Sequence, residues 1–269
     1  MSWLVVARKD FEDAIRSRWL LGLTALFVLL IALVAYLLRP APGEVASANN
    51  VLSTFGNFFV GTLVPLIALV VAYNAVTGER TSGSLKLLLS LPHSRADVVF
   101  GKVLGRTGAL AAAILVGFVL PAVVLALGPF TLDVGSYVGY TLLVVLLAAA
   151  FVAIAAGWSA AAPSQRIALA GAIGLYFLFV PFWGAIQFPL QFALASLPGW
   201  VPLEPDTIAT ALVLLNPRAA FGELSSAVLG GSLLTGGNAE FQLAALGMLV
   251  WWLLAPPLAG LLLFERRDL

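Results

Sequence analysis

Residues 78–106 read GERTSGSLKLLLSLPHSRADVVFGKVLGR and form the only long polar interruption in the first half of a very apolar chain. They hold five of the fourteen Lys and Arg residues, together with the single His. The apolar runs on both sides are long enough to cross a bilayer. Because Lys and Arg are retained on the inner side of a membrane, the sequence predicts that this segment is a cytoplasmic loop between two spans.

The loop is patterned like a folded element. Ser82 or Ser84 can cap a short helix, and Pro92 would end it, because proline cannot continue a helix. Three leucines share one side of that helix: Leu85, Leu88 and Leu89. Ser94 followed by Asp97 predicts a second capping box, from which a helix runs into the next apolar segment. We hypothesise that this loop receives a mechanical input from a partner protein.

The composition of the chain is that of an integral membrane protein. Of the 269 residues, 61% are hydrophobic and 10% are charged, whereas soluble domains are about a quarter charged. The net charge of +1 indicates no phosphate-binding face for nucleic acid. With no Cys, one His and two Met, the sequence predicts no disulfide, no zinc site and no bound metal.

Runs without charge mark six predicted membrane spans. They cover about residues 19–38, 55–76, 107–127, 136–161, 167–188 and 241–264. Each is long enough for a hydrocarbon core of ~30 Å at ~1.5 Å per helical residue. The fold class is therefore predicted to be an all-α polytopic membrane protein, with residues 1–269 forming one transmembrane domain.

The charge distribution predicts the orientation of these spans. When the N-terminus is placed inside, only Arg39 and Arg218 fall on the outer side, and the other twelve Lys and Arg lie inside. This asymmetry predicts a multi-pass protein of the cell membrane with both termini in the cytoplasm.

The segment before the first span is predicted to be an amphipathic helix over residues 3–18. Its apolar stripe holds Trp3, Leu4, Ala7, Phe11, Ala14 and Ile15. Arg8, Glu12 and Arg16 stack on the other side. Such a helix lies in the headgroup plane. Periodicity leaves open whether it is a simple anchor or also lines a docking surface for a cytoplasmic partner.

Residues 189–240 form the longest predicted outer segment. Pro189, Pro198 and Pro202 interrupt its uncharged first part, which indicates a re-entrant or interfacial hairpin. Asn216-Pro217 predicts the start of a helix with Phe221, Leu224 and Val228 on one face, which Gly230-Gly231 ends. We expect a compact cap of short helices over the bundle, acting as a structural lid or as a gate or partner-binding surface.

Small residues recur every four positions in two of the spans. The third span carries Gly101, Gly105, Ala109, Ala113 and Gly117, and the fourth carries Ala149, Ala153, Gly157 and Ala161. This spacing lets helix backbones approach closely in lipid. The repeats predict that the two spans pack on each other; a dimer seam is the alternative.

The chemistry that the chain lacks narrows its function. No predicted span contains an Asp, Glu, Lys, Arg or His, which disfavours a carrier driven by an ion gradient. There is no P-loop motif for ATP, and His93 is predicted to lie in the loop, away from Ser159 in the fourth span. The chain is therefore not predicted to be an enzyme.

Several of these residues resemble the permease subunits of ABC-2 type ABC transporters. The resemblance rests on Glu79, Gly83-Ser84-Leu85, Leu88-Leu89, Pro92, Ser94-Arg95, Gly101-Lys102 and the Asn216-Pro217 element. The N-terminal helix and residues 73–80 and 176–180 are similar to the nitrous-oxide-reductase maturation (NosY-like) branch.

The resemblance implies a homodimer with two copies of a separate cytoplasmic P-loop ATPase. It implies that the helix of residues 1–18 (the connecting helix) and residues 79–92 (the coupling helix) contact that ATPase. The residues assigned to this contact are Glu79, Arg80, Ser82, Gly83, Ser84, Leu85, Leu88, Leu89, Pro92, Arg95, Arg8 and Phe11. Glu79, Arg80 and Arg95 would set the register, and the leucines would supply the buried contact. The alternative for the leucines is packing under the bilayer surface.

By the same resemblance, ATP and Mg²⁺ would be bound by the partner ATPase, and this chain would hold no cofactor. ATP hydrolysis by the partner would drive substrate export or mechanical action on an extracytoplasmic protein, which in the NosY-like branch concerns the copper sites of nitrous oxide reductase. A scaffold that anchors other membrane proteins without transport is the alternative.

Overall fold

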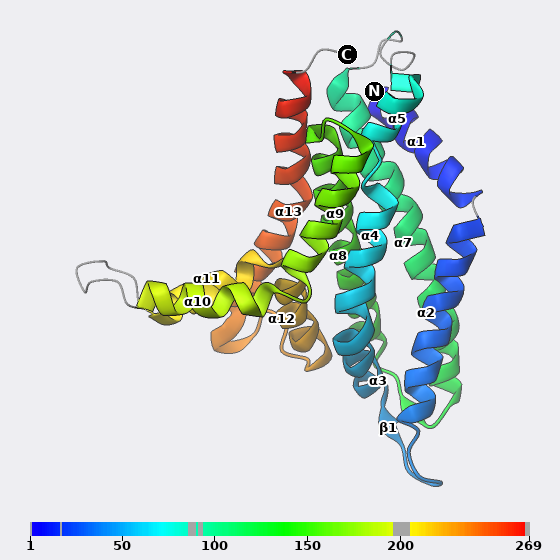
Figure 1. Cartoon of the computed structure of the whole chain (residues 1–269). Helices are drawn as coiled ribbons and strands as arrows, with labels where there is room; N and C mark the ends of the chain where they lie inside the picture. Colours follow the sequence, from blue (N-terminus) through cyan, green and yellow to red (C-terminus); the bar gives the residue numbers. More distant parts are fainter. Residues whose placement is uncertain (1, 17, 86–89, 91–93, 196–204, 267–269) are drawn as a thin grey trace.

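The computed structural model describes residues 2–16, 18–85, 90, 94–195 and 205–266. Long helices run along one axis and form a bundle (Figure 1). Helices α1 (Ser2–Ile15) and α5 (Thr77–Ser82) lie at one end of it with the C-terminal end of α13 (Ala239–Glu265), and we call this the termini end. The far end carries the two-residue strands β1 (Ala46–Ser47) and β2 (Phe130–Thr131), which pair in parallel.

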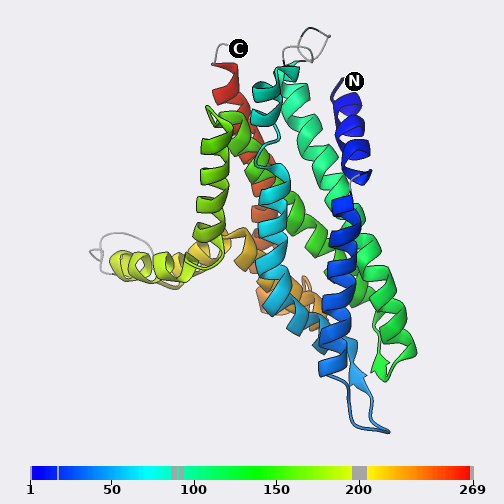
Figure 2. The same cartoon turned by 45° about the vertical axis from the view of Figure 1, so that its right-hand side comes forward.

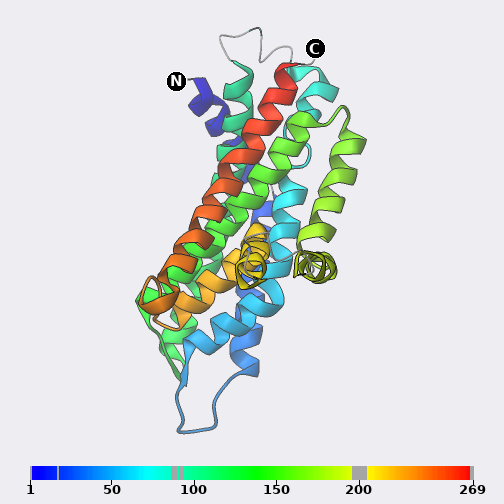
Figure 3. The same ribbon diagram turned by 90° about the vertical axis from the view of Figure 1, so that its left-hand side faces the viewer.

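Helix α8 (Val134–Ala161) is the centre of the bundle. In its most apolar window 67% of the residues are buried, against 22–50% in the other long helices. Helix α13 runs beside α8 (Figure 3), while α2 (Arg18–Leu37) and α7 (Arg95–Leu127) lie side by side on the other flank (Figure 2). The outward-facing side chains of the outer helices are apolar and exposed. Such surfaces suit contact with the hydrocarbon core of a bilayer.

Two predicted helix starts are confirmed. Ser94 and Asp97 form a capping box, and α7 begins at Arg95. Helix α12 (Pro217–Leu229) begins after the N-cap Asn216, and its buried face includes the predicted apolar residues. In both cases a side chain close in sequence accepts hydrogen bonds from the first free backbone N–H groups, so the start is fixed locally.

The second membrane helix is longer than the predicted span of residues 55–76. It consists of α3 (Ala48–Phe55), the π-helical turn η1 (Gly56–Val60) and α4 (Gly61–Ala72), and it continues toward α5. Pro65 lies inside α4. Polar residues Asn49 and Asn50 lie in the first turn of α3 and lower the local hydropathy, which explains why the predicted span begins only near residue 55.

The fifth predicted span, residues 167–188, is not one straight helix. It is divided into α9 (Gln165–Phe179) and α10 (Trp183–Ala195), which meet at an angle of 61°. Pro181 has no N–H to donate to the helical hydrogen-bond pattern, so the regular helix ends just before it. The described residues contain five helices long and apolar enough to cross a membrane, or six if this bent pair counts as one.

The expected cap over the bundle is also corrected. Helices α10 and α11 (Pro205–Leu215) lie side by side and project sideways, roughly perpendicular to the long helices (Figure 1). Helix α12 packs on the bundle, where it contacts α8 and α13, and the end of α11 meets α13 through the buried Leu214. The short helix η2 (Gly236–Asn238) then leads into α13.

Candidate functional site: the contact of α1, α5 and α7

Lys102 lies at the centre of a group of charged side chains at the termini end. Its Nζ donates to Asp10 Oδ1 on α1 at 3.0 Å and to Glu79 Oε1 on α5 at 2.8 Å. The Lys102 side chain is only 6% exposed. One cation of α7 therefore joins two segments that are distant from it in the sequence.

Arg106, one helical turn further along α7, extends this group. Its Nε donates to Asp10 Oδ2 at 3.2 Å, and its Nη1 donates to Asn74 Oδ1 at 3.0 Å and to the Val71 carbonyl. The last turn of α4 is thereby tied to the same place. We call Asp10, Glu79, Lys102 and Arg106 the ion cluster; its two carboxylates and two cations balance.

Close backbone contact between α1 and α7 surrounds the ion cluster. A Cβ added at Gly101 would lie 2.7 Å from Val6 Cβ, and one at Gly105 would lie 2.7 Å from the Ala7 carbonyl. Gly117 faces Phe27 of α2 in the same way. The glycines of the third span therefore pack against α1 and α2.

The third and fourth spans pack on each other, as predicted, since α7 contacts α8. The glycines of the two repeats, however, meet other helices. Gly157 of α8 faces the Pro256 carbonyl of α13, while the glycines of α7 face α1 and α2. Four of the five alanines of the two repeats are buried: Ala109, Ala113, Ala149 and Ala153. Spacing of small residues identifies a face that can approach another backbone, but not the helix it meets.

Leu85 is a core residue of this chain. It is 1% exposed and belongs to a cluster with Val76, Val98, Val99 and Phe264. Leu85 therefore packs within the chain and is not available as a surface contact in this structure. The other assigned loop residues Leu88, Leu89 and Pro92 lie outside the described residues.

The three charged residues expected to set the register with an ATPase contact the chain itself. Glu79 pairs with Lys102 and accepts from Ser84 Oγ. Arg80 Nη1 donates to the Ala162 carbonyl at 2.9 Å, and Arg95 Nη1 donates to the Phe264 carbonyl. Their interactions in this structure hold α5 and α7 against α8 and α13.

Phe264 lies between the two arginines. The guanidinium carbons of Arg80 and Arg95 lie 5.5 Å and 5.0 Å from the centroid of its ring, within the range of cation–π contacts. Ser159 of α8 adds a further link, because its Oγ accepts from the backbone N–H groups of Val76 and Thr77. The end of α13, the start of α5 and the start of α7 are thus held together.

Replacing Phe264 with leucine should destabilise the protein by about 1–2 kcal/mol, because the ring faces are lost while most of the apolar volume is kept. The midpoint of thermal unfolding, followed by fluorescence of the seven Trp residues, measures this. Phe188→Leu, at a site where the ring is 74% exposed, is the matched control and should change little. Equal midpoints for the two variants would contradict the proposed contact.

The remaining assigned residues lie on the surface around this contact. Ser82 and Gly83 are exposed, and Gly83 has a φ of 78°, the left-handed conformation that ends α5. The exposed Arg8 donates to Glu12 and lowers the pKa of that carboxyl group. Phe11 is half-buried against Gly108. These exposed positions remain available to another protein.

Sequence reasoning missed Asp10, Lys102, Arg106, Phe264 and Ser159 as members of the site. One signal was present: Lys102 and Arg106 are spaced i, i+4 in α7, whose only acidic residue, Asp97, serves the capping box. Cations placed on a packed helix without local acids need acids from other segments.

Among the described residues, no group of three or more His, Asp or Glu side chains is placed to hold a metal ion. What the arrangement can do is mechanical: it connects α1, α4, α5 and α7 through buried charge pairs, and α5 and α7 to α13 through Phe264.

A bundle of apolar helices long enough to cross a membrane, with charged contacts at one end, is typical of membrane transport proteins. The chain belongs to the ABC-2 family of transporter proteins, whose family description matches residues 4–269. It is a permease-type, multi-pass membrane protein.

Two curated relatives carry the same printed name, probable ABC transporter permease protein NosY. The protein from Pseudomonas aeruginosa is 35% identical over 217 residues, which cover 79% of this chain and 77% of the relative. The protein from Stutzerimonas stutzeri is 30% identical over 274 residues, which cover 97% of each chain.

Proposed function

We propose that this chain is the membrane subunit of an ABC transporter whose motor is a separate cytoplasmic ATPase, bound in two copies to a homodimer of the chain. Both termini, and with them the termini end of the bundle, lie in the cytoplasm. The support for this orientation is the distribution of Lys and Arg, and the support for the partner is the family.

The observation that carries the proposal is the ion cluster. Asp10 and Glu79 come from the two segments assigned to the ATPase contact, and both bind Lys102 of α7. A force on α1 or α5 therefore reaches a membrane-spanning helix without an intervening flexible link. ATP-driven closure of the ATPase pair would bias the bundle between two arrangements through such contacts.

The proposed surface for the ATPase is formed by the exposed residues around the cluster. Arg8, Ser82 and Gly83 lie on this surface, whereas Leu85 packs in the core of the chain. Electrostatic complementarity to Arg8 and Lys9 would favour an acidic patch on the ATPase.

A photo-crosslinking amino acid tests this surface. Placed at Ser82 or Arg8, it is expected to capture the ATPase subunit in membranes. The same group at Val45, an exposed residue at the far end, should capture none. Capture from Val45 but not from Ser82 would overturn the orientation and the site together.

The second copy has a candidate surface on α4 and α9. Leu66 and Val70 of α4 and Ile173 and Phe177 of α9 are exposed and line an apolar groove of about 200 Å³. We assign this face to the homodimer. The glycines of α7 are excluded as the seam, because the chain's own α1 and α2 cover them.

The finer function follows the NosY relatives. We propose that the complex exports a substrate or acts mechanically on an extracytoplasmic protein, in the manner of nitrous oxide reductase copper-site maturation. The scarcity of Cys, His and Met supports mechanical action over passage of copper through these helices.

A scaffold without transport is the competing function. ATP turnover by the purified complex separates the two: a coupled permease should raise or lower the ATPase rate of its partner, and that effect should require residues 79–92. A partner ATPase whose turnover is identical with and without the chain would favour the scaffold.

A further inference from the structure

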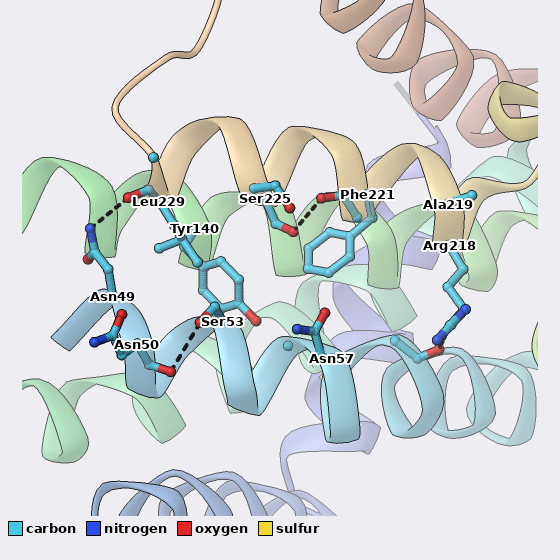
Figure 4. A pocket seen from close by; sticks show the side chains of 15 residues that line it. Asn49, Asn50, Ser53, Asn57, Tyr140, Arg218, Ala219, Phe221, Ser225 and Leu229 are labelled. Carbon is cyan, nitrogen blue, oxygen red and sulfur yellow. Dashed lines mark hydrogen bonds between the residues drawn. The ribbon is translucent and has the colours of Figure 1, made fainter. Parts of the chain in front are cut away.

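A groove of about 440 Å³ lies between α3–η1–α4 and α12, away from the ion cluster (Figure 4). The two walls run antiparallel. At one end Asn49 Nδ2 donates to the Leu229 carbonyl at 2.8 Å, and at the other Arg218 Nε donates to the Gly61 carbonyl at 3.0 Å. The walls are thus pinned at both ends and open between them.

Both walls are polar in a chain that is otherwise very apolar. Asn49, Ser53 and Asn57 recur every four residues on one wall, and Arg218, Ser225 and Ser226 are on the other. The floor is formed by Tyr140 and Phe221. A polar groove between apolar helices is costly to maintain unless polar groups are bound there.

Arg218 is the charged residue that lines this groove. Its Nε is used by the Gly61 carbonyl, whereas its other N–H groups have no hydrogen-bond partner among the described residues. No Asp or Glu among the described residues lines the groove to pair with it. A guanidinium with free N–H groups among amide and hydroxyl donors fits an oxyanion, and phosphate above all.

Two buried polar atoms at the groove have no partner within the described part of the chain: Tyr140 Oη and Asn49 Oδ1. Tyr140 is fully buried, and its hydroxyl reaches the groove wall because Gly56 has no side chain there. An unpaired buried polar atom costs about 1–3 kcal/mol. The groove therefore has hydrogen-bonding capacity that the protein itself does not use.

The spacing of these groups indicates the kind of molecule that fits. Gly56, beside Tyr140, and Gly61, beside Arg218, are five residues apart, on the order of 7 Å along a helix. That separation suits a phosphate at Arg218 followed by a short hydroxylated chain toward Tyr140. The volume is within the usual range for small-molecule sites and far exceeds that of a phosphate ion alone.

We propose that this groove binds a phosphate ester of a small polyol, with the phosphate held by Arg218 and a hydroxyl directed toward Tyr140. The phosphoglycerol headgroup of a phospholipid and soluble glycerol phosphate share this chemistry. The site is separate from the coupling contact, and the proposal stands or falls independently of the ATPase.

The test compares two probes on the full-length protein. Glycerol 3-phosphate binding is measured at equilibrium in phosphate-free detergent solution. Retention of phosphatidylglycerol against phosphatidylcholine is measured by native mass spectrometry after both lipids are offered in mixed nanodiscs. The main variant is Asn57→Asp, because the Asn57 side chain is exposed and makes no hydrogen bond within the described residues. Its carboxylate, one turn from Gly61, would compete for Arg218.

Asn57→Asp should weaken binding of one of the probes at least tenfold, and Arg218→Gln should do the same. Asn238→Asp, the same change at an exposed position outside the groove, should have no effect. Loss confined to phosphatidylglycerol identifies a lipid headgroup as the occupant, and loss for glycerol 3-phosphate identifies a soluble one. Equal binding of both probes to the wild type, Asn57→Asp and Asn238→Asp would overturn the proposal.

Discussion

Lys102→Met is expected to lower the free energy of unfolding by about 4 kcal/mol, the largest effect of any single change at the termini end. Methionine keeps the apolar stem of the side chain but leaves the Asp10 and Glu79 carboxylates close together without their shared cation. Removing one partner of a buried ion pair is strongly destabilising, because the remaining charge has lost both its water and its partner. The midpoint of Trp-monitored thermal unfolding measures the loss.

The same physics predicts a partial rescue. In the double variant Lys102→Met with Glu79→Gln, the pair Asp10–Arg106 is kept and the uncompensated charge of Glu79 is removed. More than half of the lost stability should return. Lys9→Met, at an exposed position on α1, is the matched control and should be nearly neutral. A double variant less stable than Lys102→Met would show that the cluster is not held by charge balance.

Gly157→Ala is expected to destabilise the protein by about 3 kcal/mol, the upper end for overpacking by a single methyl group. A Cβ at Gly157 would overlap the Pro256 carbonyl, and a Cβ at Gly260 would overlap the Gly157 carbonyl, so the backbones of α8 and α13 touch in both directions. Backbone atoms cannot rotate away as a flexible side chain can. The two helices would have to separate.

Gly247→Ala provides the comparison, since it lies on the same α13 and has no atom within 4 Å of an added Cβ. It should be neutral or slightly stabilising, because alanine favours a helix by up to about 1 kcal/mol over glycine. Unfolding midpoints of the two variants in one detergent measure the difference. Similar midpoints would mean that α8 and α13 do not depend on this close approach.

The elements that the sequence could predict are those specified by neighbouring residues. The start of α7 follows from Ser94 and Asp97, and the start of α12 from Asn216 and Pro217, because capping needs only side chains a few positions away. The break after α9 was also readable, since Pro181 stands inside the charge-free run; a hydropathy window averages over such a residue and cannot detect it.

The parts that could not be predicted depend on which segments meet. An apolar Leu85 suits both a contact with a partner and packing within the chain. Only its cluster with Val98 and Phe264 places it in the core. The repeat beginning at Gly101 identifies a contact face but not α1 as its partner. The charge pairs of Lys102 join residues 92 and 23 positions apart, a distance at which local pattern carries no information.

The short α9 has a consequence for the lipid around this protein. Fifteen helical residues rise only about 22 Å, less than the ~30 Å of a hydrocarbon core. Beyond it the chain turns into α10, where Phe188 and Phe192 are each 74% exposed. Acyl chains beside α9 would meet the exposed apolar side chains of α10 before they reach the opposite headgroups. A thinner leaflet would match this flank better, so we expect membrane thickness to affect this protein.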